Sequence, residues 1–243
     1  MKTNILGVQF DNLSPEQALA TALSFLDGPE TRAIFTPNPE MAMLAYKNAD
    51  FCDVLNSGDL IIPDGIGIVY ASRLTKNKIA RRVAGIDLLM SLFGKISNTG
   101  HKVYFLGAAP GVAELAAAKM TEVFPGLSIV GCHHGYFKDD ADAAIIQAIN
   151  AAEADIVLVG LGFPRQEQWI ARHRDAINAK ILMGVGGSFD VFSGKLRRAP
   201  KIFQKLGLEW LFRLLRQPKR IWRQRVLAKF MLLVLYKKLR GAL

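Results

Sequence analysis

Cysteine is scarce in this chain of 243 residues: Cys52 and Cys132 are the only two, and they lie far apart. Two isolated cysteines form neither a disulfide framework nor a cysteine-based zinc site, so we expect a reducing, cytoplasmic environment. The opening residues, MKTNILGVQFDNLS, contain no long apolar core, and we expect no secretory signal. The signatures Gly-x-Gly-x-x-Gly and Gly-Lys-Ser/Thr are also missing, which argues against dinucleotide and P-loop sites.

Acidic residues are nearly absent from one part of the chain. Residues 195–243 hold fifteen of the 31 lysines and arginines, but Glu209 is their single acid among 21 in the chain. This tail therefore carries +14, whereas residues 1–194 carry −4. We expect an α/β domain over 1–194 and a basic helical appendage over 195–243. Such charge asymmetry indicates an anionic partner.

Short apolar runs alternate with helical patterns through residues 1–194. The expected strands are 5–10, 33–35, 60–62, 103–106, 127–130, 156–159 and 181–185. The expected helices are 14–26, 41–47, a short one ending near 56, 66–71, 86–97, one ending at 124, 140–152 and one ending near 176. Alternating strands and helices predict a Rossmann-like α/β fold, in which helices cover both faces of a mostly parallel sheet.

The stretch 58–73, GDLIIPDGIGIVYASR, joins one expected strand to the next helix. Pro63 ends the apolar run because proline donates no hydrogen bond to a sheet, and Asp64 follows at once. A carboxylate at the carboxyl end of a buried strand lies where open α/β sheets bind ligands. The alternative is that Asp64 only caps the helix. A second polar turn, Thr36-Pro-Asn-Pro-Glu40, follows another apolar run, and the two turns together favour an active site.

Glycine-bearing turns follow the later strands. Gly107 and Gly111 open a helix after a strand, where backbone N–H groups and the helix dipole favour phosphate. A tight turn explains each such glycine singly, but the turns starting at Gly107, Gly131, Gly160 and Gly186 together leave room for a nucleotide diphosphate. At least one of three consecutive polar residues, Gln166, Glu167 and Gln168, should face this pocket.

Two pairs of residues suggest a metal site without completing one. His133 and His134 are adjacent, and adjacent residues rarely bind one ion together. Asp140 and Asp142 form an Asp-x-Asp, but they fall in the first turn of an expected helix, where acids complement the helix dipole. We interpret both as helix-start acids and expect no metal cofactor.

The tail interleaves basic with apolar residues after Pro200. Its apolar run Phe230–Tyr236 is seven residues long, far short of the roughly 20 needed to span a bilayer. Cationic helices rich in Trp, Phe and Leu lie in the membrane interface instead, so an anionic membrane surface is the expected partner. The alternative is a helical pair packed on the body. Nucleic acid is disfavoured because no known binding motif accompanies the basic residues.

Six motifs together identify the chain as similar to a known family. It resembles the bacterial WecG/TagA/CpsF glycosyltransferases over essentially its whole length, and most of all their wall-teichoic-acid members. The motifs are Thr36–Glu40, Pro63–Gly67, Arg82–Gly85, Gly131–Phe137, Gly160–Trp169 and Gly184–Asp190.

The resemblance implies transfer of N-acetylmannosamine from UDP-ManNAc to undecaprenyl-diphosphate-linked GlcNAc. The reaction would occur on the inner face of the cell membrane, with the protein bound peripherally. Other members of the family transfer the uronic acid of this sugar, so the donor stays open, as does assembly into a homo-oligomer. The rival from another class is a Rossmann-like oxidoreductase or nucleotide-binding module whose basic tail binds a partner.

The matching motifs imply roles for individual residues. Asp64 would be the catalytic base of an inverting transfer, taking the proton of the acceptor hydroxyl. Positive charge and N–H donors would stabilise the departing UDP, so no divalent ion is required. The substrate-binding residues expected from the motifs, the turns and the tail are Thr36, Asn38, Arg82, Gly107, Gly162, Gln166, Gly186, Arg213, Arg220 and Arg223.

Overall fold

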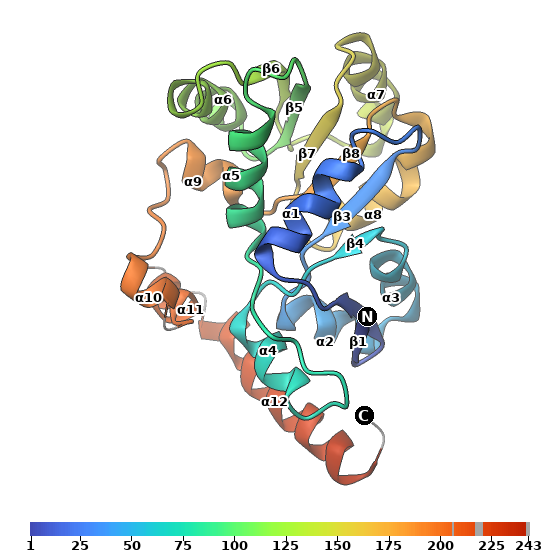
Figure 1. Ribbon diagram of the computed structural model, residues 1–243, viewed down its shortest axis with the longest axis vertical. Coiled ribbons are helices and arrows are strands. Elements are labelled where there is room, and N and C mark those ends of the chain that lie inside the picture. The colour runs from blue at the N-terminus through green and yellow to red at the C-terminus, as the bar shows by residue number, and fades with distance from the viewer. Residues whose placement is uncertain (206, 217–220, 242–243) are drawn as a thin grey trace.

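The computed structural model describes residues 1–205, 207–216 and 221–241, without the side chains of residues 205, 213 and 221–224. Its main sheet has six strands in the order β4-β3-β8-β7-β5-β6, and all neighbours pair in parallel (Figure 1). The strands are β3 (Arg32–Phe35), β4 (Leu60–Ile61), β5 (Lys102–Gly107), β6 (Ser128–His133), β7 (Ile156–Gly160) and β8 (Ile181–Gly184). The α/β fold with a parallel sheet is thus confirmed.

Helices cover both faces of the sheet because successive strand side chains point to opposite sides. In β5, Val103 and Phe105 pack in one core, whereas Tyr104 and Leu106 pack in another. The first core is closed by α1 (Pro15–Ser24), α5 (Gly85–Ile96), α6 (Val112–Val123) and α9 (Ser188–Phe192), and Phe105 stacks on Phe189 with ring centroids 4.8 Å apart. The second is closed by α7 (Asp142–Ala151) and α8 (Arg165–His173).

The first strand expected from the sequence, 5–10, is wrong. The chain instead forms an antiparallel hairpin of β1 (Lys2–Ile5) and β2 (Val8–Asp11). The reversal lies at Leu6 and Gly7, whose φ values of 54° and 97° take the backbone into the left-handed region that glycine adopts readily. The hairpin packs on a third core with α2 (Pro39–Lys47), α3 (Ala49–Asn56) and α4 (Ile66–Ser72).

Two expected helices are divided. The helix expected over 140–152 begins as the short 3-10 turn η1 (Asp139–Ala141) and continues as α7. The helix expected to reach residue 176 ends as α-helix at His173 and continues as η2 (Arg174–Ala176). The remaining helices lie within a few residues of their expected bounds, as is usual for helix ends.

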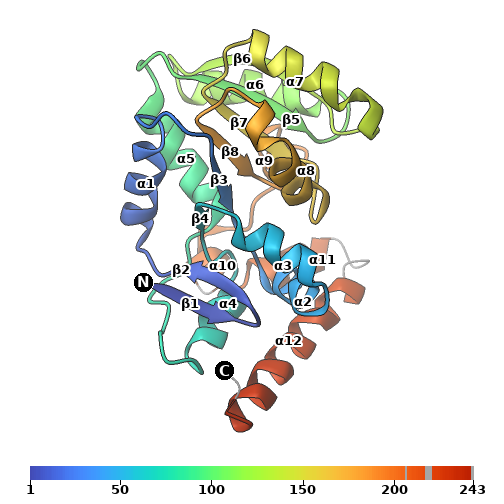
Figure 2. The same cartoon turned by 90° about the vertical axis from the view of Figure 1, so that its right-hand side faces the viewer.

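The tail forms α10 (Lys201–Lys205), α11 (Glu209–Arg216) and α12 (Ile221–Leu239). The helix α12 packs against α2 and α4 (Figures 1 and 2), where Phe230 and Val234 are fully buried in the third core. Its other side leaves Leu232, Leu235 and Leu239 exposed. The alternative that the tail helices pack on the body is therefore correct for one side of α12. The opposite side exposes these three leucines. No helix in the described ranges is long and apolar enough to cross a membrane.

Candidate active site

The carboxyl ends of the parallel strands bring the two polar turns together. Thr36 follows β3 and Asp64 follows β4, and these strands are neighbours in the sheet. The backbone N–H of Asp64 donates to the carbonyl of Pro37 at 3.2 Å, and that of Val83 donates to the carbonyl of Pro63 at 3.2 Å. The segment before α5 is thereby fixed beside both turns, which places Arg82 against Asp64.

Asp64 binds Arg82 rather than capping α4. Nε and Nη2 of Arg82 both donate to Oδ1 of Asp64, at 3.3 and 3.1 Å. The helix α4 begins after Gly65 and receives no hydrogen bond from a capping side chain, so the capping alternative is wrong. Oδ2 of Asp64 makes no hydrogen bond to any described residue, and the side chain is 32% exposed, which leaves this oxygen open to a substrate.

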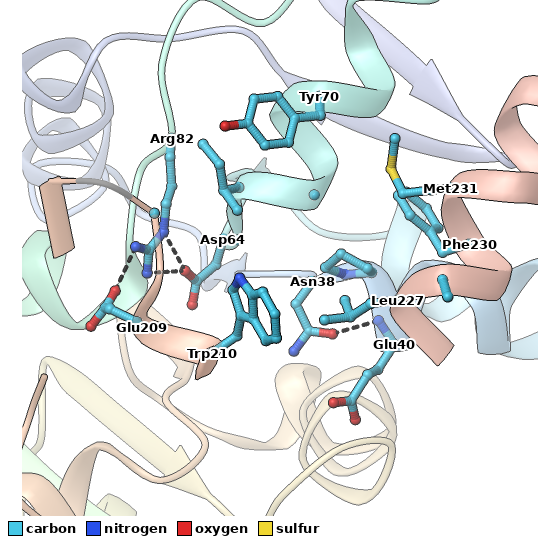
Figure 3. Close-up of a pocket in the computed structure, with 16 residues that line it drawn as sticks. Asn38, Glu40, Asp64, Tyr70, Arg82, Glu209, Trp210, Leu227, Phe230 and Met231 are labelled. Atoms are coloured by element: carbon cyan, nitrogen blue, oxygen red, sulfur yellow. Dashed lines mark hydrogen bonds and ion pairs between the residues drawn. The ribbon is translucent and has the colours of Figure 1, made fainter. Parts of the chain in front are cut away.

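Arg82 lies between two carboxylates, Asp64 and Glu209 (Figure 3). Its Nη1 is 2.5 Å from Oε2 of Glu209, the first residue of α11. Burial on its own would lower the pKa of Arg82, but the charges of the two carboxylates outweigh burial, and the pKa is raised above its ordinary value. Arg82 is therefore a permanent cation beside the candidate base.

Two cavities meet at this ion-pair group. One, of about 680 Å³, is lined by the strand ends and by polar and cationic groups. The other, of about 480 Å³, lies between the body and the tail and is lined largely by apolar side chains, among them Trp210, Leu227 and Met231 (Figure 3). Both are lined by Asn38, Asp64, Arg82 and Glu209. A substrate in either cavity therefore reaches Asp64.

The expected pocket residues near the turns take up distinct positions. Thr36 lines the polar cavity, where its side chain contacts Gly85 so closely that a Cβ added there would sit 3.0 Å from the Thr36 methyl. Asn38 caps α2, because its Oδ1 accepts from the N–H groups of Glu40 and Met41 at 2.9 and 3.1 Å. With this oxygen engaged, the NH₂ group of Asn38 is the part left to donate to a ligand.

Gln166 is the member of the 166–168 trio that lines the polar cavity. Its Oε1 accepts from the N–H of Gly186 at 3.0 Å, and its Nε2 donates to Oε1 of Glu167 at 2.7 Å. Glu167 is fully buried, and burial raises its pKa to about 7 although the hydrogen bonds from Gln166 and from its own backbone N–H act to lower it. Glu167 thus fixes which way the Gln166 amide points.

The three glycines expected to bind substrate differ in whether they line a cavity. Gly162 and Gly186 line the polar cavity, and both have positive φ, 76° and 51°. Gly107 lines neither cavity. Gly107 has φ of 139°, and a Cβ added there would overlap the backbone of Gly160 on the neighbouring strand. A glycine is therefore needed at this position because the ends of β5 and β7 lie so close together.

The tail contributes cations to the site that were not among the residues expected from the sequence. Lys195, Arg197, Arg198 and Arg216 line the polar cavity. Arg198 also binds Asp87 of α5 through two hydrogen bonds, at 2.6 and 2.8 Å. Three other arginines of the tail were expected to bind substrate. Of these, Arg220 lies outside the described residues, as do the side chains of Arg213 and Arg223. Glu209 also lines this cavity. The sequence marks it only as the single acid among the basic residues of the tail.

The candidate metal ligands have other contacts. The ring Nδ1 of His133 lies 2.8 Å from the carbonyl of His134. Asp142 starts α7 as expected, but it is also buried and binds Nε1 of Trp169 and Nε2 of His173, each at 2.9 Å. The helix-start interpretation was therefore incomplete, because Asp142 also joins α7 to α8. No group of three or more metal-binding side chains occurs among the described residues.

Comparison with known proteins identifies the family to which the chain belongs. Residues 3–242 match the model of the glycosyl transferase WecG/TagA/CpsF family. Two proteins from Staphylococcus aureus strains MRSA252 and MW2 are each 38% identical to the chain over 233 residues, which cover 95% of this chain and 91% of theirs. Both are named N-acetylglucosaminyldiphosphoundecaprenol N-acetyl-beta-D-mannosaminyltransferase. The match excludes the oxidoreductase alternative, and the chain belongs to the WecG/TagA/CpsF family of glycosyltransferases.

Proposed function

We propose that the protein transfers N-acetylmannosamine from UDP-ManNAc to undecaprenyl-diphosphate-linked GlcNAc, in the synthesis of a teichoic-acid linkage unit. The names of the S. aureus relatives, at 38% identity over nearly the whole chain, support this donor and this acceptor. The observation that carries the proposal is the position of Asp64 where a polar and an apolar cavity meet. A polar nucleotide sugar and a lipid-linked acceptor need those two environments on either side of one base.

Asp64 acts as the general base. Its Oδ1 is held by Arg82, its Oδ2 makes no hydrogen bond to a described residue, and the residue lines both cavities. A carboxylate placed in this way takes the proton from the acceptor hydroxyl as the hydroxyl oxygen attacks the anomeric carbon. The bond from that carbon to the UDP oxygen breaks on the opposite side, so the anomeric configuration inverts.

The departing UDP carries the charge that the reaction develops. Lys195, Arg197, Arg198 and Arg216 line the polar cavity and place positive charge around it. The backbone at Gly162 and Gly186 lines the same cavity, and glycine there lets a diphosphate approach the chain closely. Because fixed cations stabilise a leaving anion without a metal ion, we propose that the reaction needs no divalent cation.

The tail also sets where the enzyme works. Leu232, Leu235, Tyr236 and Leu239 are exposed on α12, and Lys229 and Lys238 are near them in the helix. Apolar and cationic side chains on one helix bind the interface of an anionic bilayer. We propose that this surface holds the protein peripherally on the inner face of the cell membrane, next to its lipid-linked acceptor.

The test is a donor screen with a short-chain prenyl-diphosphate-GlcNAc acceptor and product mass spectrometry. UDP-ManNAc should give a product heavier by one N-acetylhexosamine, and the anomeric configuration read by NMR should be inverted. A product formed only from UDP-ManNAc uronic acid would replace the proposed donor while keeping the reaction class. No product from any UDP-sugar would refute the proposal.

A further inference from the structure

Glu209 is an isolated acid in a basic tail. It is the single acidic residue of 195–243, yet only 6% of it is exposed. A buried carboxylate needs a positively charged partner, and here the main partner comes from the body. Nη1 of Arg82 lies 2.5 Å from its Oε2, which makes a close ion pair. Nε of Arg198 lies 3.5 Å from its Oε1.

Glu209 and Asp64 hold opposite ends of one guanidinium. Nε and Nη2 of Arg82 donate to Asp64, while Nη1 faces Glu209 (Figure 3). The guanidinium is planar and rigid. Fixing Nη1 therefore also fixes the directions in which Nε and Nη2 point. Those two groups hold Oδ1 of Asp64, and so they set where Oδ2 lies in the cavity.

We propose that Glu209 is a positioning residue, which orients the Asp64 carboxylate through Arg82. Without the Glu209 charge, the Arg82 guanidinium is free to turn toward the anionic diphosphate of a bound substrate, and Asp64 loses its fixed partner. This inference rests on the proposed role of Asp64 as the base. It also gives the tail a catalytic consequence distinct from lipid attraction, because the residue that holds Arg82 belongs to α11.

The tail is docked by other contacts besides Glu209. Arg198 binds the Asp87 carboxylate through two hydrogen bonds. Gly207, with φ of 70°, lies so close to Ile66 of α4 that an added Cβ would be 2.9 Å from its Cγ1. These contacts do not involve Arg82. Loss of the Glu209 charge should therefore leave α11 docked, which separates positioning from docking.

The experiment compares Glu209→Gln with the matched control Asp87→Asn, using UDP-ManNAc and a soluble short-chain acceptor. Asp87→Asn removes an ion pair between the tail and the body but leaves Arg82 untouched. Glu209→Gln should lower kcat roughly 10- to 100-fold, as expected when a reacting group is misplaced by about an ångström, while KM for the donor stays within about twofold. Asp87→Asn should lower kcat less than about tenfold, because it disturbs Arg198 at the polar cavity but leaves the contacts of Arg82 with Asp64 and Glu209 in place. Equal kcat values for the two variants would overturn the proposal.

A double-mutant cycle tests whether the effect passes through Arg82. In an Arg82→Ala background, Glu209→Gln should cause no further loss of kcat, because its partner is already gone. Losses that multiply would show that Glu209 acts by another route, and would overturn the proposal. If Glu209→Gln does not fold, as judged by near-UV circular dichroism, Glu209→Asp replaces it. That carboxylate is one methylene too short to reach Arg82, and wild-type kcat in the folded variant would contradict the inference.

The two proposals fail in different ways. Wild-type activity in Asp64→Asn would remove the base itself and with it this inference. An inactive Asp64→Asn together with an undiminished Glu209→Gln would leave Asp64 as the base and refute only the positioning role of Glu209.

Discussion

Glu167 makes the stability of the fold depend on pH. The side chain is fully buried on α8, and its Oε2 has no hydrogen-bond partner among the described residues. Burial raises its pKa from 4.5 to about 7. Between these values the folded protein binds a proton that the unfolded chain has already released. The stabilisation is therefore complete below pH 4.5 and is lost as the pH rises through 7.

The size of this effect follows from the shift in pKa. Each pKa unit is equivalent to 1.36 kcal/mol, so a rise from 4.5 to about 7 corresponds to about 3 kcal/mol. Glu167→Gln keeps the shape and removes the titration. We expect the unfolding free energy of the wild type, relative to Glu167→Gln, to fall by about 3 kcal/mol between pH 4.5 and pH 8.

Urea denaturation of both proteins at several pH values measures this difference directly. The variant Glu122→Gln, on the exposed face of α6, is the matched control, and its curve should run parallel to that of the wild type. A difference between wild type and Glu167→Gln that stays constant with pH would refute the reasoning, since it would show that Glu167 does not gain a proton on folding.

Four further predictions concern the tail and the chemistry. Phe230→Ala empties a fully buried site on α12 and should lower the unfolding free energy by about 3–5 kcal/mol; a loss below about 1 kcal/mol in urea would contradict the packing. Activity should survive EDTA, and its loss with recovery on adding magnesium or manganese would show that a metal is needed. Deleting the chain from Lys195 should release the protein from anionic vesicles in flotation. Alanine at Arg213, Arg220 or Arg223 should lower turnover of a soluble acceptor in at least one case, and wild-type rates for all three would leave them with lipid attraction alone.

The sheet could be predicted because its signals are local. Val103–Leu106 and Ile156–Val159 are apolar runs with a glycine directly after them, and both are strands of the sheet. The hairpin was missed because Ile5, Val8 and Phe10 give a loose alternation that does not reveal the reversal at Leu6 and Gly7. A turn made by positive φ in two residues leaves little trace in a pattern of apolar spacing.

The candidate site was predictable in part for the same reason. Asp64 lies in a proline–glycine turn, and the apolar residues directly before it show that this turn follows a strand. The contact of Arg82 with Glu209 depends instead on how α11 docks against the body, and no local pattern encodes it. Charge counting did single out Glu209 as the lone acid of the tail, but it could not name the partner.

The most direct test of the account is Asp64→Asn, assayed with UDP-ManNAc and the lipid-linked acceptor alongside calorimetry of UDP binding. Asparagine keeps the shape of the side chain but cannot take the acceptor proton. Transfer should fall roughly 10²- to 10⁴-fold, as expected when a general base is lost, while the affinity for UDP and the fold are largely kept. A variant that keeps more than a tenth of the wild-type rate would contradict the claim that Asp64 is the base.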